Sequence, residues 1–523
     1  MTEVGSKISK SHSRLLFASC NSQHHKQVIW DNILQRNASA FVWGGDAIYA
    51  DSIEKVTPPH RFQKLYEKQK QNPGYKKLMD QNIPILGVLD DHDYGTDNGD
   101  VTYPHRKESG VEFACNFLEL KGTAMCERAK QGLGVYGVKV MDFSRPKGKE
   151  MLSDIEAGLD PDVLAENDPE AQVSLSNKSV AIFLLDMRSN KSPYSKIKKN
   201  DYTGDFLGGS QWKWFQEALN RSTASVNIVV QGIQLHTDRV WPVETWSRFP
   251  ASQHRLYQAL LQDHVKAPIV VSGDVHHAQL LRKDCRFVKR GKPSPTSQTR
   301  TLLEITTSGM THSWGTETCG KPHKLFLCRM KIFKWAAKKS MQFAQRINGA
   351  RVWTELIDNS TPDMAQHNTK EEGKLGLQFT LERNFAELEF DWEDQSVTLR
   401  VLGEKLDGKP LLSTRWSFES LSEKNWGDFL GGPALSTDQQ IADSFYSLAR
   451  LGAFDKELED GQWICLNYRG LPDPIHRVVG LMLPILMGVF LTMTPCILPF
   501  LVTLLFRRTY SRRPGAASKA KHH

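Results

Sequence analysis

The chain has 523 residues, which exceeds a typical single domain, and its composition of 40% hydrophobic and 24% charged residues is ordinary for a globular protein. The net charge of +8 is modest, and the chain shows no zinc-finger spacing, RNA-binding aromatic signature or helix-turn-helix pattern, so we expect no nucleic-acid partner. The eight cysteines form no CxxC pair and lack the spacing of a small disulfide-rich domain, so they leave the redox compartment open.

Short apolar runs rich in β-branched residues predict buried strands, because near-continuous hydrophobicity is typical of sheets covered on both faces. These runs are residues 14–19, 40–45, 84–90, 179–188, 226–235, 267–274 and 301–309. Helical patterns lie between them, around residues 25–36, 109–120, 210–219 and 252–264. Two later runs, 385–392 and 396–403, alternate between apolar and polar residues and predict a half-exposed antiparallel pair. Together these elements predict layered α/β sheets.

Several segments interrupt this pattern. Residues 1–12 predict an N-terminal tail, and residues 145–177, which are acidic and contain proline, predict a surface insertion. Residues 286–300 predict a basic loop. Within residues 321–346 apolar side chains recur at helical spacing opposite lysines, which leaves two interpretations open. The segment is either a basic amphipathic helix on anionic lipid or a helix packed on its own core.

Side chains able to bind cations follow four of the predicted strands. They are Cys20, Asp46 with Tyr49, Asp90 to Asp93, and Asp274 with His276. In layered α/β folds the pocket lies beyond the carboxyl ends of the strands, so we expect these side chains to converge. Crowded carboxylates raise one another's pKa unless cations neutralise them, and a glycine before Asp46 and before Asp274 lets the backbone approach. A single aspartate after a strand is more often a helix N-cap, but the coincidence at four strand ends predicts a metal site.

The same stretches carry an ordered set of motifs over residues 13–403. They are FASC (17–20), GGDAIYAD (44–51), LDDHDYGTDN (89–98), LLDMRS (184–189), QWKWF (211–215), SGDVHHAQL (272–280) and TSGMTHSW (307–314). In content and order they resemble the PhoD-like, or alkaline phosphatase D, branch of the calcineurin-like metallophosphoesterases. That branch has Ser-Cys after the first strand where the wider superfamily has Asp-x-His. The resemblance implies an α/β/β/α metallophosphoesterase sandwich over residues 13–474.

The resemblance also implies a binuclear or polynuclear metal site, with iron and calcium as the candidate ions. Thiolate and phenolate donors favour an iron-type ion over magnesium, and the remaining oxygen donors would suit calcium. Asn98 is the least direct assignment, because TDN replaces the common NN arrangement of the family. The implied ligands are Cys20, Asp46, Tyr49, Asp91, Asn98, Asp274 and His276.

Further polar residues are candidates for contact with substrate. His92 follows Asp91 as the phosphate-contacting histidine of the superfamily does, and it is interpreted as a general acid or, alternatively, as a residue that orients a ligand. Arg106 is a candidate phosphate clamp, although a solvated arginine at a helix start is the other interpretation. His312 is expected to line the pocket. Arg188 is expected to make a structural ion pair rather than to touch substrate.

The C-terminal segment Val478–Phe506 carries no charge and is long enough to cross a bilayer, so residues 475–508 predict a membrane anchor. Pro495 and Pro499 within it leave a kinked span and a hairpin open. The basic tail 509–523 should stay cytosolic by the positive-inside rule, and its end, KAKHH, resembles an endoplasmic-reticulum retrieval signal. We therefore expect an endoplasmic-reticulum or related endomembrane location. Without a signal peptide, a cytosol-facing catalytic domain is favoured, and the alternatives are a span inserted with its basic end translocated or a domain exported by an unrecognised route.

These features predict hydrolysis of phosphate esters by a metal-activated hydroxide, in a membrane-anchored phosphomonoesterase of the alkaline-phosphatase type. One alternative is a phosphodiesterase or phospholipase D-like hydrolase that acts on lipid or diester substrates. Another is a catalytically silent membrane scaffold. The expected partners are a phosphate-ester substrate and membrane lipid, and the oligomeric state is not indicated.

Overall fold

The computed structural model describes residues 13–52, 56–163, 173–195, 201, 203–237, 244–288, 299–316, 379–422 and 461–466. The chain divides into two compact units, Met1–Gly470 and Leu471–His523, and all described residues belong to the first. Four predicted segments lie outside the described residues: the tail 1–12, the amphipathic segment 321–346, the anchor 475–508 and the basic tail 509–523. Among the described helices, none combines the length and hydropathy needed to cross a bilayer.

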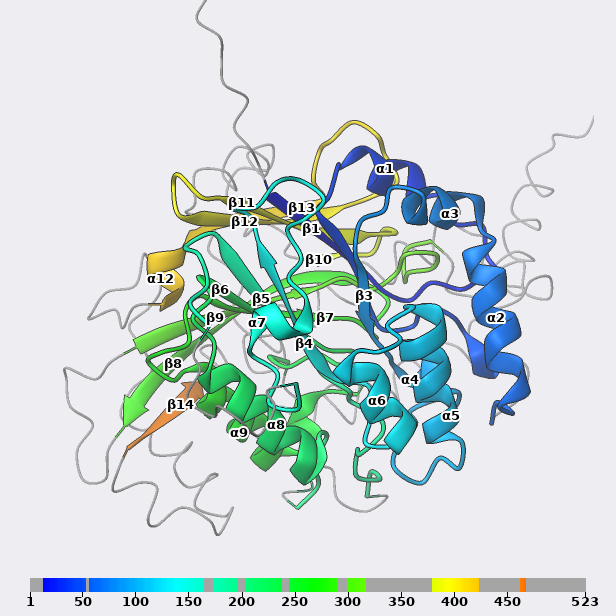
Figure 1. Cartoon of the computed structure of the whole chain (residues 1–523), viewed down its shortest axis with the longest axis horizontal. Helices are drawn as coiled ribbons and strands as arrows, with labels where there is room; N and C mark the ends of the chain where they lie inside the picture. Colours follow the sequence, from blue (N-terminus) through cyan, green and yellow to red (C-terminus); the bar gives the residue numbers. More distant parts are fainter. Residues whose placement is uncertain are drawn as a thin grey trace, which may run out of the picture. The chain divides into compact units, whose positions relative to one another are not determined.

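The first of two sheets has six strands in the order β13-β12-β11-β1-β2-β3. β1, β2 and β3 run parallel, so their carboxyl ends share one edge, and β11, β12 and β13 add an antiparallel meander (Figure 1). The bounds are Ser13–Ala18 (β1), Ala40–Gly44 (β2), Ile85–Val88 (β3), Phe385–Asp391 (β11), Ser396–Leu402 (β12) and Leu412–Ser417 (β13).

The second sheet has eight strands, in the order β10-β8-β9-β7-β6-β5-β4, with β14 paired to β8. Its centre, β5, β6, β7 and β9, is parallel, whereas β4, β8, β10 and β14 pair antiparallel with their neighbours. The bounds are Gly137–Asp142 (β4), Ser179–Leu184 (β5), Val226–Val230 (β6), Pro268–Ser272 (β7), Ala278–Val288 (β8), Thr299–Thr306 (β9), Phe379–Thr380 (β10) and Gln462–Leu466 (β14).

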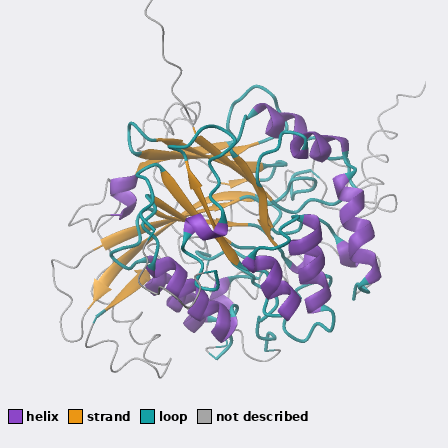
Figure 2. Ribbon diagram, viewed as in Figure 1, coloured by secondary structure: helices purple, strands orange, loops and turns teal. Residues whose placement is uncertain are grey.

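Helices lie around the strands of these sheets (Figure 2). Their bounds are Trp30–Gln35 (α1), Ala50–Ser52 (η1), His60–Lys70 (α2), Pro73–Met79 (α3), Asp91–Tyr94 (α4), Arg106–Val111 (α5), Glu112–Phe117 (η2, a π-helix), Ala124–Gln131 (α6), Asp154–Ala157 (α7), Gly208–Asn220 (α8), Trp246–Arg248 (η3), Pro250–Leu260 (α9) and Phe418–Ser422 (α12). α4 begins directly after β3, so the aspartates that end this strand also form the first turn of a helix.

The central strands are continuous apolar runs because successive side chains point alternately into two different cores. On β5, Val180 and Ile182 pack in a core that also contains side chains of the first sheet. Ala181 and Phe183 pack instead in a second core with α8 and α9. Because successive side chains of a strand point to opposite faces, the second sheet is buried on both sides. The predicted mixed α/β fold with two sheets is confirmed.

The structure corrects three expectations. β11 and β12 form the predicted antiparallel pair, but both are almost entirely buried rather than half-exposed, because the glutamates of β11 form ion pairs with arginines, among them Arg400 of β12, instead of facing water. β8 continues to Val288, so the first residues of the predicted basic loop 286–300 are strand. Residues 145–177 connect β4 to β5, and Leu152 and Leu159 of this segment pack in the second core rather than on the surface.

Candidate active site

The predicted strand ends meet through close backbone contacts. The backbone N–H of Asn21, after β1, donates to the carbonyl of Asp46, after β2, at 2.8 Å. At Gly45, which has φ +99°, a Cβ would lie 2.7 Å from that of Asp90 beyond β3. At Gly273, beyond β7, a Cβ would lie 2.7 Å from the Gly44 carbonyl oxygen. The glycines before Asp46 and Asp274 are therefore required by the close approach of four strand ends.

Backbone strain is concentrated among the predicted ligands. Five of them adopt left-handed φ values that non-glycine residues rarely occupy: Cys20 (57°), Asp46 (52°), Asn98 (54°), Asp274 (68°) and His276 (53°). Such conformations are costly and persist where the surrounding structure imposes them, typically at active sites. The strain turns the side chains out of the strand direction, so that residues from different strands can face one another.

The first group of ligand-type atoms joins residues from β1, β2 and β7. Cys20 Sγ lies 3.6 Å from Asp46 Oδ2, and the hydroxyl of Tyr49 lies 3.0 Å from His276 Nε2 and 3.5 Å from Asp46 Oδ2. The side chains of Cys20, Asp46 and His276 each offer an atom within 4.8 Å of the other two. Ser308 bridges the group, since its hydroxyl lies 2.9 Å from Cys20 Sγ and accepts the His276 N–H at 2.6 Å.

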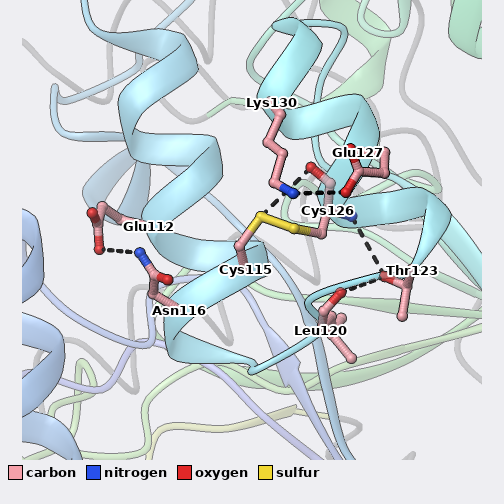
Figure 3. Close-up of a disulfide and its surroundings, with 8 residues drawn as sticks. All are labelled: Glu112, Cys115, Asn116, Leu120, Thr123, Cys126, Glu127 and Lys130. Atoms are coloured by element: carbon pink, nitrogen blue, oxygen red, sulfur yellow. Dashed lines mark hydrogen bonds and ion pairs between the residues drawn. A yellow bond between two sulfur atoms is a disulfide. The ribbon is translucent and has the colours of Figure 1, made fainter.

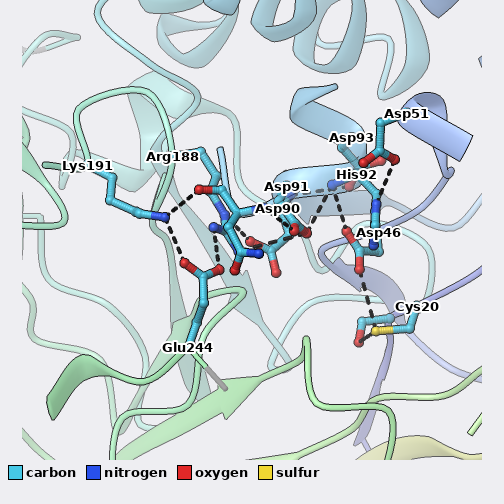
Figure 4. A network of polar contacts seen from close by, with 12 residues as sticks. Cys20, Asp46, Asp51, Asp90, Asp91, His92, Asp93, Arg188, Lys191 and Glu244 are labelled. Carbon is cyan, nitrogen blue, oxygen red and sulfur yellow. Dashed lines mark hydrogen bonds and ion pairs between the residues drawn. The ribbon is translucent and has the colours of Figure 1, made fainter. Parts of the chain in front are cut away.

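A second group adjoins the first through Asp46, which clusters with Asp91 and His92. The backbone N–H of His92 donates to Asp46 Oδ1 at 3.3 Å, and its ring Nδ1 lies 2.7 Å from Asp51 Oδ1 (Figure 4). The ring also stacks on Tyr49, with centroids 4.0 Å apart. His92 is therefore fixed from two sides, by a carboxylate and by an aromatic face, next to two carboxylates that could hold a cation.

The third group contains Asp90, Asp91 and Asp274 and has Arg188 at its border. Arg188 is fully buried; its Nε donates to Asp90 Oδ1 at 2.5 Å and its Nη1 to Glu244 at 2.6 Å (Figure 4). These contacts confirm that Arg188 makes ion pairs, and its partners are Asp90 and Glu244.

The charges around Arg188 do not balance. Four carboxylates lie in this part of the site, on Asp90, Asp91, Asp274 and Glu244, against two cationic side chains, Arg188 and Lys191, so two negative charges remain when all six groups are ionised. Asp90 Oδ2 and Arg188 Nη2 are buried without a hydrogen-bond partner. A divalent cation would supply the missing charge and give the orphaned carboxylate oxygen a partner.

Burial dominates the protonation equilibria of the site. It raises the pKa of Asp274 well above its usual range, and Asp90 and Asp91 raise it further. The pKa of Asp46 is likewise raised well above normal by burial. Burial also raises the pKa of the Cys20 thiol to about 12. Thiolate and carboxylate ligands must lose their protons to bind a metal, so these groups fit cation binding only if the ion itself offsets the cost of burial.

Asp91 behaves differently from its neighbours. Burial alone would raise its pKa, but His92, Arg188 and the backbone N–H of Asn98 together hold the pKa well below the usual range. The Asn98 N–H donates to Asp91 Oδ2 at 2.8 Å, and the Asn98 carbonyl accepts from Lys191 at 2.8 Å. The structure thus shows Asn98 supporting Asp91 through its backbone, and a direct ligand role for its side chain stays a prediction.

The remaining predicted residues lie at different distances from this cluster. His312 lies beside it: its ring centroid is 4.4 Å from that of His276 and 4.9 Å from that of Tyr49. Arg106 begins α5, and its Nη1 donates to the carbonyl of Ser189 at 3.3 Å. In the described part of the chain this carbonyl, rather than the ligand cluster, is its hydrogen-bond partner, so the phosphate-clamp role stays a prediction.

Sequence reasoning missed several residues of the site. Asp51 and Ser308 stand inside motifs noted above, where their polar side chains were a usable signal. Glu244 and Lys191 belong to no motif and meet Arg188 only in the folded chain. Asp93, the last residue of DDHD, does not face the cluster; its carboxylate accepts the backbone N–H groups of Ala47 and Ile48, both at 3.1 Å, and so holds the loop after β2.

Comparison with known proteins bears on this arrangement. Residues 177–374 match the family model described as PhoD-like phosphatase. A solved structure described as PhoD is 13% identical over 86% of this chain and 77% of that chain, with a TM-score of 0.45. No curated protein sequence matches the chain.

The family match includes Arg188, Glu244, Asp274, His276 and His312 and bears out the resemblance noted from the motifs. By this match residues 177–374 carry a PhoD-like phosphatase domain, which supports a phosphatase, a class of hydrolase. The family is one of metal-dependent phosphoester hydrolysis, with which the clustered donor atoms agree.

Proposed function

We propose that the chain is a membrane-anchored phosphomonoesterase that holds two or more cations in the cluster beyond β1, β2, β3 and β7. The observation that carries the proposal is the convergence of ligand-type side chains from four strand ends into three adjacent groups, joined through Asp46 and Asp91. Cys20, Asp46, Tyr49 and His276 would hold an iron-type ion, because thiolate, phenolate and imidazole suit a transition metal. Asp90, Asp91 and Asp274 would hold a harder ion such as calcium.

When bound, the cations would neutralise the phosphoryl oxygens and activate water for attack on phosphorus. His92 would hold the proton that the leaving-group oxygen needs. Burial alone would lower the pKa of His92, but Asp91, Asp46 and the hydrogen bond to Asp51 raise it well above its ordinary value. The protonated ring, oriented through Nδ1, would present Nε2 as the donor. His312 would border the substrate on the side of Tyr49 and His276.

The proposal is tested with Asp274→Asn in the full chain. We expect the variant to lose metal-dependent hydrolysis of phosphate monoesters and to bind less metal, with an unchanged circular dichroism spectrum. Asp80→Asn, on an exposed residue after α3, is the matched control and should retain both metal and activity. Full activity in purified Asp274→Asn protein would contradict the proposed site.

The alternative functions give different results in the same assays. A phosphodiesterase or phospholipase D-like enzyme, which the predicted anchor favours, would hydrolyse diesters or phospholipids faster than monoesters. A silent scaffold would hydrolyse neither and would bind no metal. The scaffold is disfavoured because a group of buried carboxylates without counter-charges is costly to maintain unless cations bind there.

The anchoring part of the proposal rests on sequence. The uncharged segment Val478–Phe506 and the basic tail after it support an anchor in the endoplasmic reticulum or a related endomembrane. The full chain should therefore resist alkaline carbonate extraction from membranes. Leu486→Lys combined with Val489→Lys should release it, because each lysine costs about 3 kcal/mol at the centre of a span. Extraction of the unmodified chain would contradict the anchor.

A further inference from the structure

The described cysteines separate into two kinds. Cys115 of η2 is bonded to Cys126 of α6 (Figure 3), and Cys285 of β8 is bonded to Cys465 of β14. Cys20 is the one cysteine of the described residues outside a disulfide, and it is also the one that faces the candidate metal cluster. The fold therefore keeps the thiol that a metal would need and pairs the four other described cysteines.

Disulfides of this kind indicate an oxidising environment. Cytosolic thiol pools keep most such pairs reduced, whereas the endoplasmic-reticulum lumen and extracellular spaces oxidise them. The cysteine spacing alone leaves the compartment open, and the expected cytosol-facing domain would keep these thiols reduced. The two disulfides point to the opposite side of the membrane. This placement also lets a single span hold the catalytic domain on one side and the basic tail 509–523 in the cytosol, as the positive-inside rule requires.

In a lumenal domain, Asn-x-Ser/Thr sequons can accept N-linked glycans. Four sequons lie in described parts of the chain, at Asn37, Asn177, Asn190 and Asn220. Three of them are exposed, and each lies shortly before the first residue of a strand. Asn37 precedes β2, Asn177 precedes β5, and Asn220 ends α8 before β6.

These three sequons stand on the side of the sheets away from the active site. β2, β5 and β6 belong to the parallel parts of the two sheets, and the candidate site lies beyond the carboxyl ends of such strands. Asn177 and the segment before β6 are neighbours, since the Ser225 hydroxyl donates to the Asn177 carbonyl at 2.9 Å. Glycans at the amino ends of the strands would leave the metal cluster accessible to substrate.

Asn190 differs from the other three. It follows β5 at the carboxyl side, is only partly exposed, and its Nδ2 donates to the Leu133 carbonyl at 2.9 Å. A glycan attaches to this same nitrogen. A modified Asn190 would carry the sugar on the nitrogen that contacts the Leu133 carbonyl and so place it against the chain, and we therefore expect the folded protein to carry none there.

We propose that the catalytic domain faces the oxidising, lumenal side of its membrane and that Asn37, Asn177 and Asn220 are N-glycosylation sites. At each site the amide nitrogen forms a bond to the anomeric carbon of an oligosaccharide, the bond from that carbon to its lipid-diphosphate carrier breaks, and the amide loses one proton. Each disulfide forms as two thiols give up two protons and two electrons to the thiol oxidants of the lumen. Neither step requires the phosphatase activity.

The glycans are tested on the full chain produced in eukaryotic cells. Peptide-N-glycosidase should increase the electrophoretic mobility of the protein. Asn37→Gln, Asn177→Gln and Asn220→Gln should each remove one glycan from the untreated pattern, and Asn190→Gln should leave that pattern unchanged. Mobility that glycosidase does not alter overturns the three sites.

The placement is tested through the cysteines, with a maleimide reagent on denatured, unreduced protein. If the disulfides exist in the cell, Cys115→Ser releases Cys126 and Cys285→Ser releases Cys465, so each variant gains one reactive thiol. If the domain is reduced in the cytosol, each substitution instead removes one reactive thiol, and that result overturns the placement. Cys20→Ser is the control, because it should lose one reactive thiol.

Discussion

Two groups of buried carboxylates in this protein are neutralised in different ways. Glu387 and Glu389 on β11 are matched by Arg14, Arg36 and Arg400, and the Arg36 guanidinium donates two hydrogen bonds to Glu387 at 2.5 and 2.7 Å. Although burial would raise the pKa of Glu389, Arg400 and Arg14 hold it below its usual value.

In the described part of the chain, Asp46 beyond β2 and Asp274 beyond β7 lack such a set of partners, whereas Asp90 and Asp91 beyond β3 share Arg188. The pKa values of Asp46 and Asp274 are raised well above normal by burial, and no arginine among the described residues forms an ion pair with either carboxylate. The difference distinguishes structure from function: carboxylates that the chain neutralises itself stabilise the meander, whereas carboxylates left without counter-charges fit an external cation. Substitutions of the aspartates should therefore lower activity, whereas substitutions of the glutamates should lower stability.

The largest effect is expected from Asp46→Asn, because Asp46 belongs to two of the three ligand groups. Losing several kcal/mol of transition-state charge stabilisation should lower kcat/KM by about 10³-fold or more. Bound metal, measured by elemental analysis, should fall in parallel. In the metal-free state the thermal midpoint should not fall, since the substitution removes a buried charge. Metal-free Asp46→Asn protein that melts well below the metal-free parent would show that Asp46 is structural.

Glu387→Gln should act on stability instead of activity. The Glu387 side chain is fully buried, and the substitution removes the ion-pair partner of Arg36 and leaves Arg400 paired with Glu389 alone. We expect a loss of about 3 kcal/mol in the free energy of unfolding, at the lower end for a broken buried pair because these arginines are partly exposed. Denaturant titration measures it, with Glu419→Gln, exposed on α12, as a control that should change by less than about 0.5 kcal/mol. Loss of activity in folded Glu387→Gln protein would remove the distinction between the two groups.

The smallest of these effects is expected from Asp51→Asn. Asp51 orients His92 through a 2.7 Å contact but is absent from the three ligand groups. Removing such a partner typically costs about 10–100-fold in activity. We expect the loss in kcat, with bound metal retained, while Asp31→Asn on the exposed surface of α1 should leave kcat unchanged. A loss of metal equal to that in Asp46→Asn would reassign Asp51 as a ligand.

Alternating polarity in residues 385–403 shows where sequence reasoning failed. The alternation correctly predicted two antiparallel strands, because period-two patterning is local. It also predicted that the polar face meets water, and this was wrong: Glu387 and Glu389 meet arginines from residues 14, 36 and 400. A polar residue at an alternating position is compatible with solvent or with a buried ion pair, and only the packing of distant segments distinguishes the two.

The sequence by itself determined the strands, the order of the motifs and most of the residues gathered at the strand ends, since hydrophobic periodicity and short-range motifs depend on neighbours in the chain. Only the tertiary structure decided which charges remain unbalanced, which cysteines pair, and which sequons face solvent. Arg188 meets Asp90 across 98 positions, and Cys285 meets Cys465 across 180. The first contact joins the ends of strands from the two sheets, and the second joins the neighbouring strands β8 and β14 of one sheet. Interactions between such distant residues form only when the fold brings them within a few ångströms of one another.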